Sequence, residues 1–206
     1  LRRIAKLAKE NRRAAKLITG AALPQAMWGI ESLGLSPTQL DILCTQTAGA
    51  SGCTVAGSCV TTAIAFSNVV HPAVYIARNM LTSYFQLLPL YTAHFSRFRA
   101  GWAAAWKQVL CIGEWAYLEE GNEMSRYPLQ CIIRWGCVFG PLTALIATLA
   151  QYKWFCRSMD RWYGPDGFAY KLTADAGTTD KKKFIDFVCT SVYQHVWAKA
   201  TAHEGG

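Results

Sequence analysis

Residues 17–43 read LITGAALPQAMWGIESLGLSPTQLDIL, and this stretch predicts two helices joined by a tight turn. Gly34 supplies a stop signal for the first helix, because glycine readily takes the left-handed conformation found just past a helix end. Ser36 can cap the second helix, Pro37 suits its first position, and Gln39 follows the serine at the spacing of a capping box. The fold is therefore predicted to be organised around this helical joint.

Apolar periodicity, followed outward from the joint, predicts a mainly α-helical chain. We expect helices over residues 2–19, 22–33, 37–48, 59–68, 72–88, 90–110, 141–152 and 180–200. The exception is the turn signal Pro165-Asp166-Gly167 between two aromatic runs, which predicts one small β-hairpin near residues 161–172. The expected fold class is a helical, bundle-like array with that single hairpin.

An acidic stretch is expected to separate two parts of this array. Four glutamates lie between residues 114 and 123, next to a Gly-Asn pair, in a region whose secondary structure the sequence leaves open. We therefore expect a helical region at 1–110, a surface connection at 111–137, and a helix, hairpin and C-terminal helix at 138–206.

Positive charge is concentrated at the start of the chain. The net charge is +8, yet residues 1–20 alone carry +6, from seven basic side chains and one acid. The basic residues are Arg2, Arg3, Lys6, Lys9, Arg12, Arg13 and Lys16. An amphipathic helix with this face suits phosphate groups, on nucleic acid or on lipid. The alternative is a solvated helix face without a ligand.

Eight cysteines are scattered through the chain, and their spacing fits no common zinc motif. Several lie in apolar runs, where a free thiol packs as a small hydrophobic group. The basic start has no apolar segment of the kind that makes a secretory signal. We therefore expect an intracellular protein, nuclear or cytoplasmic, in a reducing compartment. The apolar run at 138–150 is too short to span a bilayer, so no transmembrane segment is expected.

Most catalytic signatures are absent from the sequence. It contains no phosphate-binding glycine loop, no H-E-x-x-H motif and no adjacent aspartates of the kind that hold two metal ions. Cys44 with a histidine elsewhere could form a thiol nucleophile, but its local sequence favours a buried thiol. Rings and cations alternate between Phe95 and Lys107, which fits either nucleobase stacking or, more simply, a helix with an aromatic core face. We predict no catalytic residue, metal ligand or cofactor in this sequence, and no small-molecule substrate.

The joint resembles a segment of a known protein family. Residues 14–43 are similar to the segment that follows the catalytic palm in reverse transcriptases of LINE-type (non-LTR) retrotransposons, in the divergent form common in some protist genomes. Trp28-Gly29-Ile30-Glu31 stands where these proteins have Tyr-Gly-x-Glu, so Trp28 replaces the usual tyrosine. Later family features are matched in order by Gly140-Pro141, Trp154, Trp162, Pro165-Asp166-Gly167 and Leu172. Lys153 occupies a position that is often glycine in the family.

The resemblance implies a place in a larger polyprotein rather than an activity. It implies a thumb-like and connecting segment that grips a template–primer duplex through phosphate contacts, with RNA or an RNA–DNA duplex as the partner. The polymerase carboxylates and their Mg²⁺ would lie in sequence before Leu1, so the chain would be a part of an RNA-directed DNA polymerase without its catalytic residues. The seven basic residues named above are the expected nucleic-acid contacts. The expected structural motif is Trp28, Gly29, Glu31, Ser36 and Pro37.

Two alternatives stay open at the level of sequence. The amphipathic start could lie on an anionic membrane surface instead of on nucleic acid. The chain could also be a degenerate retroelement relic without activity, and it would then fail to fold cooperatively. A self-contained enzyme is the least favoured interpretation, because no constellation of residues supports one.

Overall fold

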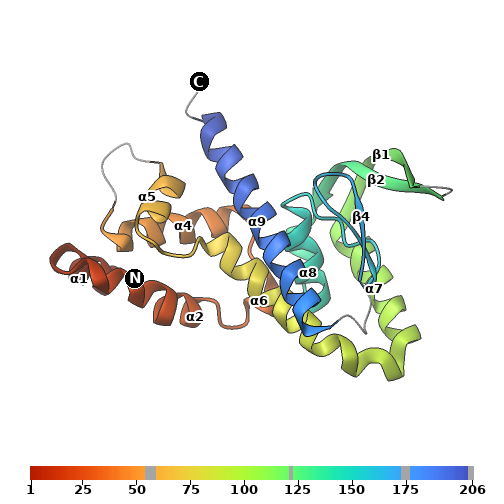
Figure 1. Cartoon of the computed structure of the whole chain (residues 1–206), viewed down its shortest axis with the longest axis horizontal. Coiled ribbons are helices and arrows are strands. Elements are labelled where there is room, and N and C mark those ends of the chain that lie inside the picture. Colours follow the sequence, from red (N-terminus) through yellow and green to blue (C-terminus); the bar gives the residue numbers. More distant parts are fainter. Residues whose placement is uncertain (54–58, 121–122, 173–176, 204–206) are drawn as a thin grey trace. The chain divides into compact units, whose positions relative to one another are not determined.

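The computed structural model describes residues 1–53, 59–120, 123–172 and 177–203 (Figure 1). Over these residues the chain is mainly helical with two antiparallel two-stranded sheets, so the predicted fold class is confirmed. The chain forms two compact units. Unit 1 comprises Leu1–Ile30, Leu35–Arg78 and Val188–Gly206, and unit 2 comprises Glu31–Gly34 and Asn79–Phe187. The division expected at residues 110 and 137 stays a prediction.

Unit 1 begins with helix α1 (Arg2–Glu10), which is shorter than the helix expected over 2–19. Asn11 interrupts it with an extended backbone (φ −140°, ψ 105°), and its side-chain oxygen accepts the Arg13 N–H at 2.9 Å. Asparagine forms such local bonds in competition with the helical ladder. The prediction of one continuous helix is wrong for this reason. The chain continues as the 3-10 helix η1 (Arg12–Ala15), the π-helical turn η2 (Ile18–Ala22) and α2 (Leu23–Ala26).

The helical joint forms, but the first of its two expected helices is divided. Gly29, with a φ of +80°, turns the chain between α2 and the short α3 (Ile30–Leu33). The second helix, α4 (Pro37–Ser51), starts as predicted. The Gln39 N–H donates to Ser36 Oγ at 3.4 Å, and the Ser36 N–H donates to Gln39 Oε1 at 3.0 Å. The capping box read from the sequence is therefore confirmed.

Helix α4 packs against α1 and α5 (Val60–Phe66) within unit 1. It extends three residues beyond the expected end at residue 48, and Gly52 terminates it with a φ of +74°. A Cβ added at Gly52 would lie 3.4 Å from the Cβ of Ala8, so glycine allows α1 to approach closely. Part of the loop expected at 49–58 lies outside the described residues. Helix α6 (Pro72–Leu87) follows, where a helix was predicted.

Unit 2 is built on the end of α6, the 3-10 helix η3 (Leu88–His94), α7 (Phe95–Val109) and α8 (Pro141–Ala150). The regular helix α6 ends just before Pro89, as predicted, because proline lacks the N–H that would continue the ladder. Within unit 2, α7 and α8 pack against each other.

Both sheets belong to unit 2. Strand β1 (Leu110–Glu120) pairs antiparallel with β2 (Glu123–Ile133) and forms the long green ribbon that follows α7 in Figure 1. The sequence indicated a surface connection here and left its secondary structure open, so this second hairpin was not predicted. Glu, Gly and Pro are depleted in strands, and the ladder is irregular on both sides of Glu114. The hairpin predicted near 161–172 is confirmed as β3 (Arg161–Tyr163) and β4 (Ala169–Lys171).

The turn of the β3–β4 hairpin forms through the chemistry that predicted it. Asp166 Oδ1 accepts the Phe168 N–H at 3.1 Å, and Gly167 adopts a φ of +83°. The Gly164 N–H donates to the Phe168 carbonyl at 3.0 Å and closes the loop.

An aromatic cluster forms the core of unit 2 and holds this hairpin. Trp102 of α7 and Trp162 of β3 are at most 1% exposed, and their rings stack with centroids 6.2 Å apart. The Trp102 indole N–H donates to the Cys156 carbonyl at 2.7 Å, and the Tyr84 hydroxyl donates to the Met159 carbonyl at 2.6 Å. These contacts supply the packing that a two-stranded hairpin needs for stability.

Helix α9 (Thr178–His203) is the last element. It begins two residues before the helix expected over 180–200, so Asp180 lies in its first turn, where a carboxylate stabilises the positive end of the helix dipole. Val188 and Val192 of α9 are fully buried. Neither α9 nor another helix of the described residues has both the length and the apolar character needed to cross a membrane.

Candidate functional site

The basic segment, residues 2–16, carries the expected nucleic-acid contacts. Arg3 and Lys6 are exposed on α1 and lie one helical turn apart, and Arg13 and Lys16 are exposed in the turns that follow. The side chains of Arg2, Lys9 and Arg12 lie outside the described part of the structure. Four of the seven predicted cations are therefore known to face solvent, where they can meet an anionic partner.

The apolar side of the basic segment is only partly covered. Ala8 and Ile18 are buried in unit 1, but Leu7 is 51% exposed and Leu17 is 48% exposed. Exposed leucines beside exposed cations form the pattern of helices that lie in a membrane interface. The segment therefore carries features of both candidate partners, nucleic acid and an anionic membrane.

Three residues of the expected structural motif lie at a helix start or in a turn. Ser36 and Pro37 begin α4, and Gly29 supplies the turn before α3. Trp28 is 91% exposed, so its indole is not part of a packed core. Glu31 is half-buried and lines a cavity of unit 2.

A buried cysteine–histidine pair lies in unit 1. Cys44 Sγ, on α4, is 3.8 Å from Nε2 of His71, the residue that precedes α6. His71 Nδ1 accepts the Ala73 N–H at 3.2 Å. Because Nδ1 is an acceptor in this bond, the proton of the neutral imidazole belongs on Nε2, where it points at the sulfur.

Burial decides what this pair can do. It raises the pKa of the Cys44 thiol to about 12, with a smaller contribution from Asp41 that Lys199 opposes. Burial also lowers the pKa of His71 to about 4. Both groups are therefore neutral at pH 7, whereas a thiol nucleophile needs a lowered cysteine pKa and a base that can take its proton. His71 serves as the N-cap of α6, and the expectation of a buried Cys44 is confirmed.

The rings and cations that alternate along α7 occupy different environments. Trp102 is buried and hydrogen-bonded, and Phe98 packs edge-on against it with centroids 6.1 Å apart. Arg97, Arg99 and Lys107 are exposed. This is the arrangement of a helix with an aromatic core face, so the Trp102 ring is not available to stack on nucleobases.

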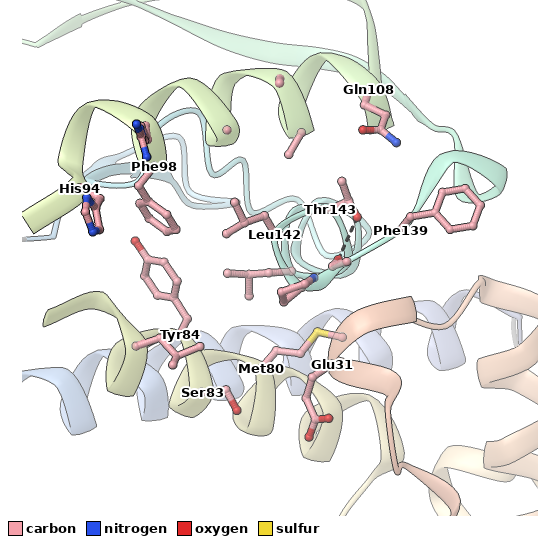
Figure 2. A pocket seen from close by; sticks show the side chains of 18 residues that line it. Glu31, Met80, Ser83, Tyr84, His94, Phe98, Gln108, Phe139, Leu142 and Thr143 are labelled. Atoms are coloured by element: carbon pink, nitrogen blue, oxygen red, sulfur yellow. Dashed lines mark hydrogen bonds between the residues drawn. The ribbon is translucent and has the colours of Figure 1, made fainter. Parts of the chain in front are cut away.

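Unit 2 contains a cavity of about 620 Å³ between α6, α7 and the start of α8 (Figure 2). Its apolar walls are formed by Met80, Tyr84, Leu87, Phe98, Leu142 and Leu145. Polar side chains lie among them, and two are already engaged: Thr143 Oγ1 donates to the Gly140 carbonyl at 2.9 Å and Gln108 Nε2 to the Cys137 carbonyl at 2.8 Å. His94 and Arg97 also line the cavity and are exposed.

Neither the cavity nor the Cys44–His71 pair was predicted from the sequence. The cavity is assembled from elements far apart in the chain, so no local motif marks its residues. His71 had one local signal, a polar side chain directly before a proline that begins a helix. Within the described ranges, no group of three His, Cys, Asp or Glu side chains is arranged to hold a metal ion.

No protein-family model, no curated protein and no solved structure matches the chain.

Proposed function

We propose that the chain is a non-catalytic thumb and connection segment of a retroelement reverse transcriptase, and that it grips RNA or an RNA–DNA duplex through the basic segment. The observation that carries the proposal is the exposure of Arg3, Lys6, Arg13 and Lys16 in a region whose only acid is Glu10. Exposed lysines and arginines bind phosphates with little desolvation, and their contacts hold a duplex in place without reading its sequence.

Two glycines that belong to the family resemblance support this proposal. Gly140 precedes Pro141 at the start of α8 and has a φ of +89°. Gly167, in the hairpin turn, has a φ of +83°. Both backbones favour glycine strongly over other residues. The fold therefore favours glycine at both matched positions, which is consistent with the resemblance.

The test is binding of the full chain to a short RNA–DNA duplex, measured by fluorescence anisotropy at several salt concentrations. Four neutralised phosphates predict a slope of about −3.6 in log affinity against log salt, or roughly a hundredfold loss of affinity between about 50 and 200 mM salt. A flat salt dependence contradicts the proposal, because phosphate contacts release counterions.

A matched pair of variants assigns the contacts to the basic segment. In the first variant, Arg3, Lys6, Arg13 and Lys16 are replaced by glutamine. The control replaces four exposed cations of α7 and α9 by glutamine, namely Arg99, Lys107, Lys182 and Lys183. Both variants lose the same charge, so a loss of duplex binding confined to the first supports contact at the basic segment. Equal losses point instead to a general effect of net charge.

The exposed leucines favour a second candidate function, association with an anionic membrane surface. Leu7 and Leu17 can enter the interface while Arg3, Lys6 and Lys16 remain at the headgroups. Flotation with anionic and with neutral liposomes tests this candidate. Replacing both leucines by glutamine is expected to abolish flotation and to leave duplex binding unchanged if both activities exist. If the chain does not float with anionic vesicles, the membrane candidate is rejected.

A further inference from the structure

We propose that the cavity of unit 2 is a binding site for a small amphipathic carboxylate, with an apolar chain inside the cavity and the carboxylate at the end formed by His94 and Arg97. The sequence indicated no small-molecule substrate, and this proposal of a bound ligand departs from that expectation. It is independent of the function proposed for the basic segment.

The size and lining of the cavity fit a small ligand. A volume of about 620 Å³ lies within the range of roughly 300–1,000 Å³ that is typical of small-molecule sites. The walls combine aliphatic side chains, such as Met80 and Leu142, with the rings of Tyr84 and Phe98. Burying an acyl chain against this surface is favourable because it removes apolar area of both partners from water.

Hydrogen bonds to neighbouring segments hold the helices that form the cavity walls. The Tyr84 hydroxyl and the Trp102 indole are bonded to carbonyls of the 156–159 segment, which ties α6 and α7 to one backbone. At the opposite end of α7, Gln108 is bonded to the Cys137 carbonyl. The Gly140 N–H donates to the Ser32 carbonyl at 2.8 Å and fixes the start of α8. Because these bonds limit collapse of the walls, the cavity is pre-formed and a ligand need not order it.

The distribution of charge selects the orientation of the ligand. Figure 2 shows His94 at one end of the cavity, Glu31 and Phe139 toward the other, and Tyr84 and Leu142 between them. Arg97 follows His94 by three residues and lines the same cavity. An anionic head is therefore attracted to the His94 end and repelled by the glutamate end.

A carboxylate suits the cationic end better than a larger anion does. The planar guanidinium of Arg97 can donate two parallel hydrogen bonds to one carboxylate. Arg97 and His94 are both exposed, so the head remains hydrated at the mouth and only the apolar chain is desolvated. The ligand class is thus a monocarboxylate with an unbranched or aromatic apolar body.

The test uses the full chain, with sodium decanoate as the charged probe and decan-1-ol as its uncharged counterpart, both below the concentration at which they aggregate. Calorimetry on the wild-type protein is expected to give saturable, one-to-one binding with a clear preference for decanoate. Arg97→Met should weaken decanoate binding about tenfold or more and leave decanol binding unchanged. Arg99→Met is the matched control, because Arg99 is exposed on the same helix and does not line the cavity.

A second variant tests the cavity itself. Gly101 lies in the α7 wall, and a Cβ added there has no heavy atom within 4 Å. Gly101→Leu should therefore fold, fill part of the cavity and weaken binding of both probes. Three results would overturn the proposal: no saturable binding of decanoate to the wild-type protein, equal affinity for decanoate and decanol, or unchanged binding by Gly101→Leu. If the glutamine variant of the basic segment loses decanoate binding, the probe binds there and the cavity assignment is wrong.

Discussion

Replacing His71 by asparagine tests the buried pair through the pH dependence of stability. Burial lowers the pKa of His71 from 6.5 to about 4. As the pH falls below 6.5, the unfolded chain takes up a proton that the folded chain does not accept until about pH 4, so protonation favours unfolding. At 1.36 kcal/mol per pH unit, the wild-type protein should lose about 3 kcal/mol of unfolding free energy between those two pH values.

Asparagine is the informative replacement because it keeps the cap and removes the titrating group. Its side-chain oxygen can accept the Ala73 N–H as the imidazole does. At neutral pH the His71→Asn variant should be less stable by about 1–2 kcal/mol, since Cys44 loses its neighbour and a small cavity remains. On acidification the wild-type protein should lose about 3 kcal/mol more than the variant, so the variant becomes the more stable of the two near pH 4.

Urea unfolding of both proteins between about pH 4 and pH 7 measures this difference directly. Carboxylates that titrate over the same range affect both proteins alike and cancel in the comparison. Replacing the exposed His94 by asparagine is the control for the loss of a histidine outside the buried pair. Parallel curves for the wild-type protein and His71→Asn would refute the assignment of His71 as a buried, neutral cap.

Three further substitutions test other parts of the structure by chemical unfolding. Trp102→Phe should cost about 1–3 kcal/mol more stability than Trp162→Phe, because it leaves the Cys156 carbonyl unpaired. Trp162→Phe breaks no such bond, since the Trp162 indole N–H is buried with no hydrogen-bond partner among the described residues. Equal costs would show that the Trp102 bond contributes nothing to stability. Gly34→Ala should destabilise the fold by more than about 1 kcal/mol, because φ at Gly34 is +65° and the new Cβ would lie 3.3 Å from a ring carbon of Trp135. An unchanged denaturant midpoint of unfolding would exclude this backbone conformation at Gly34. Lys153→Gly should stabilise by about 0.5–1 kcal/mol, because its φ of +65° is strained for lysine; a loss of stability would contradict that prediction.

The parts of the fold that were predictable are those fixed by local chemistry. Ser36 and Gln39 satisfy each other across one helical turn, and Asp166 bonds its own turn, so neighbouring residues determine both structures. Asn11 shows where apolar periodicity fails to predict the end of a helix. The amphipathic pattern continues on both sides of Asn11, yet the helix ends there, where the Asn11 side chain accepts the Arg13 N–H.

The β1–β2 hairpin was missed because its strands contain glutamate, glycine and proline, which are depleted in sheets. A local signal was present, since the Gly121-Asn122 pair between the strands is typical of a hairpin turn. The cavity was not predictable, because it depends on non-local packing. The exposure of Lys6 and Arg13 could be predicted, since charge on an amphipathic segment faces solvent. The position of Arg97 at a cavity could not, because that cavity depends on the packing of α6, α7 and α8.

Lys153 connects the family resemblance to the backbone. Helix α8 ends with the Trp154 N–H donating to the Leu149 carbonyl at 3.0 Å and the Lys153 N–H donating to the Ala150 carbonyl at 3.1 Å. These two bonds define a Schellman motif. In this motif the residue that donates the shorter-range bond takes the left-handed conformation, which glycine adopts without strain. Lys153 holds that conformation here, at the position where the retroelement proteins often have glycine. The left-handed conformation of Lys153 is therefore set by the way α8 ends, and this is the physical reason that Lys153→Gly is expected to stabilise the fold.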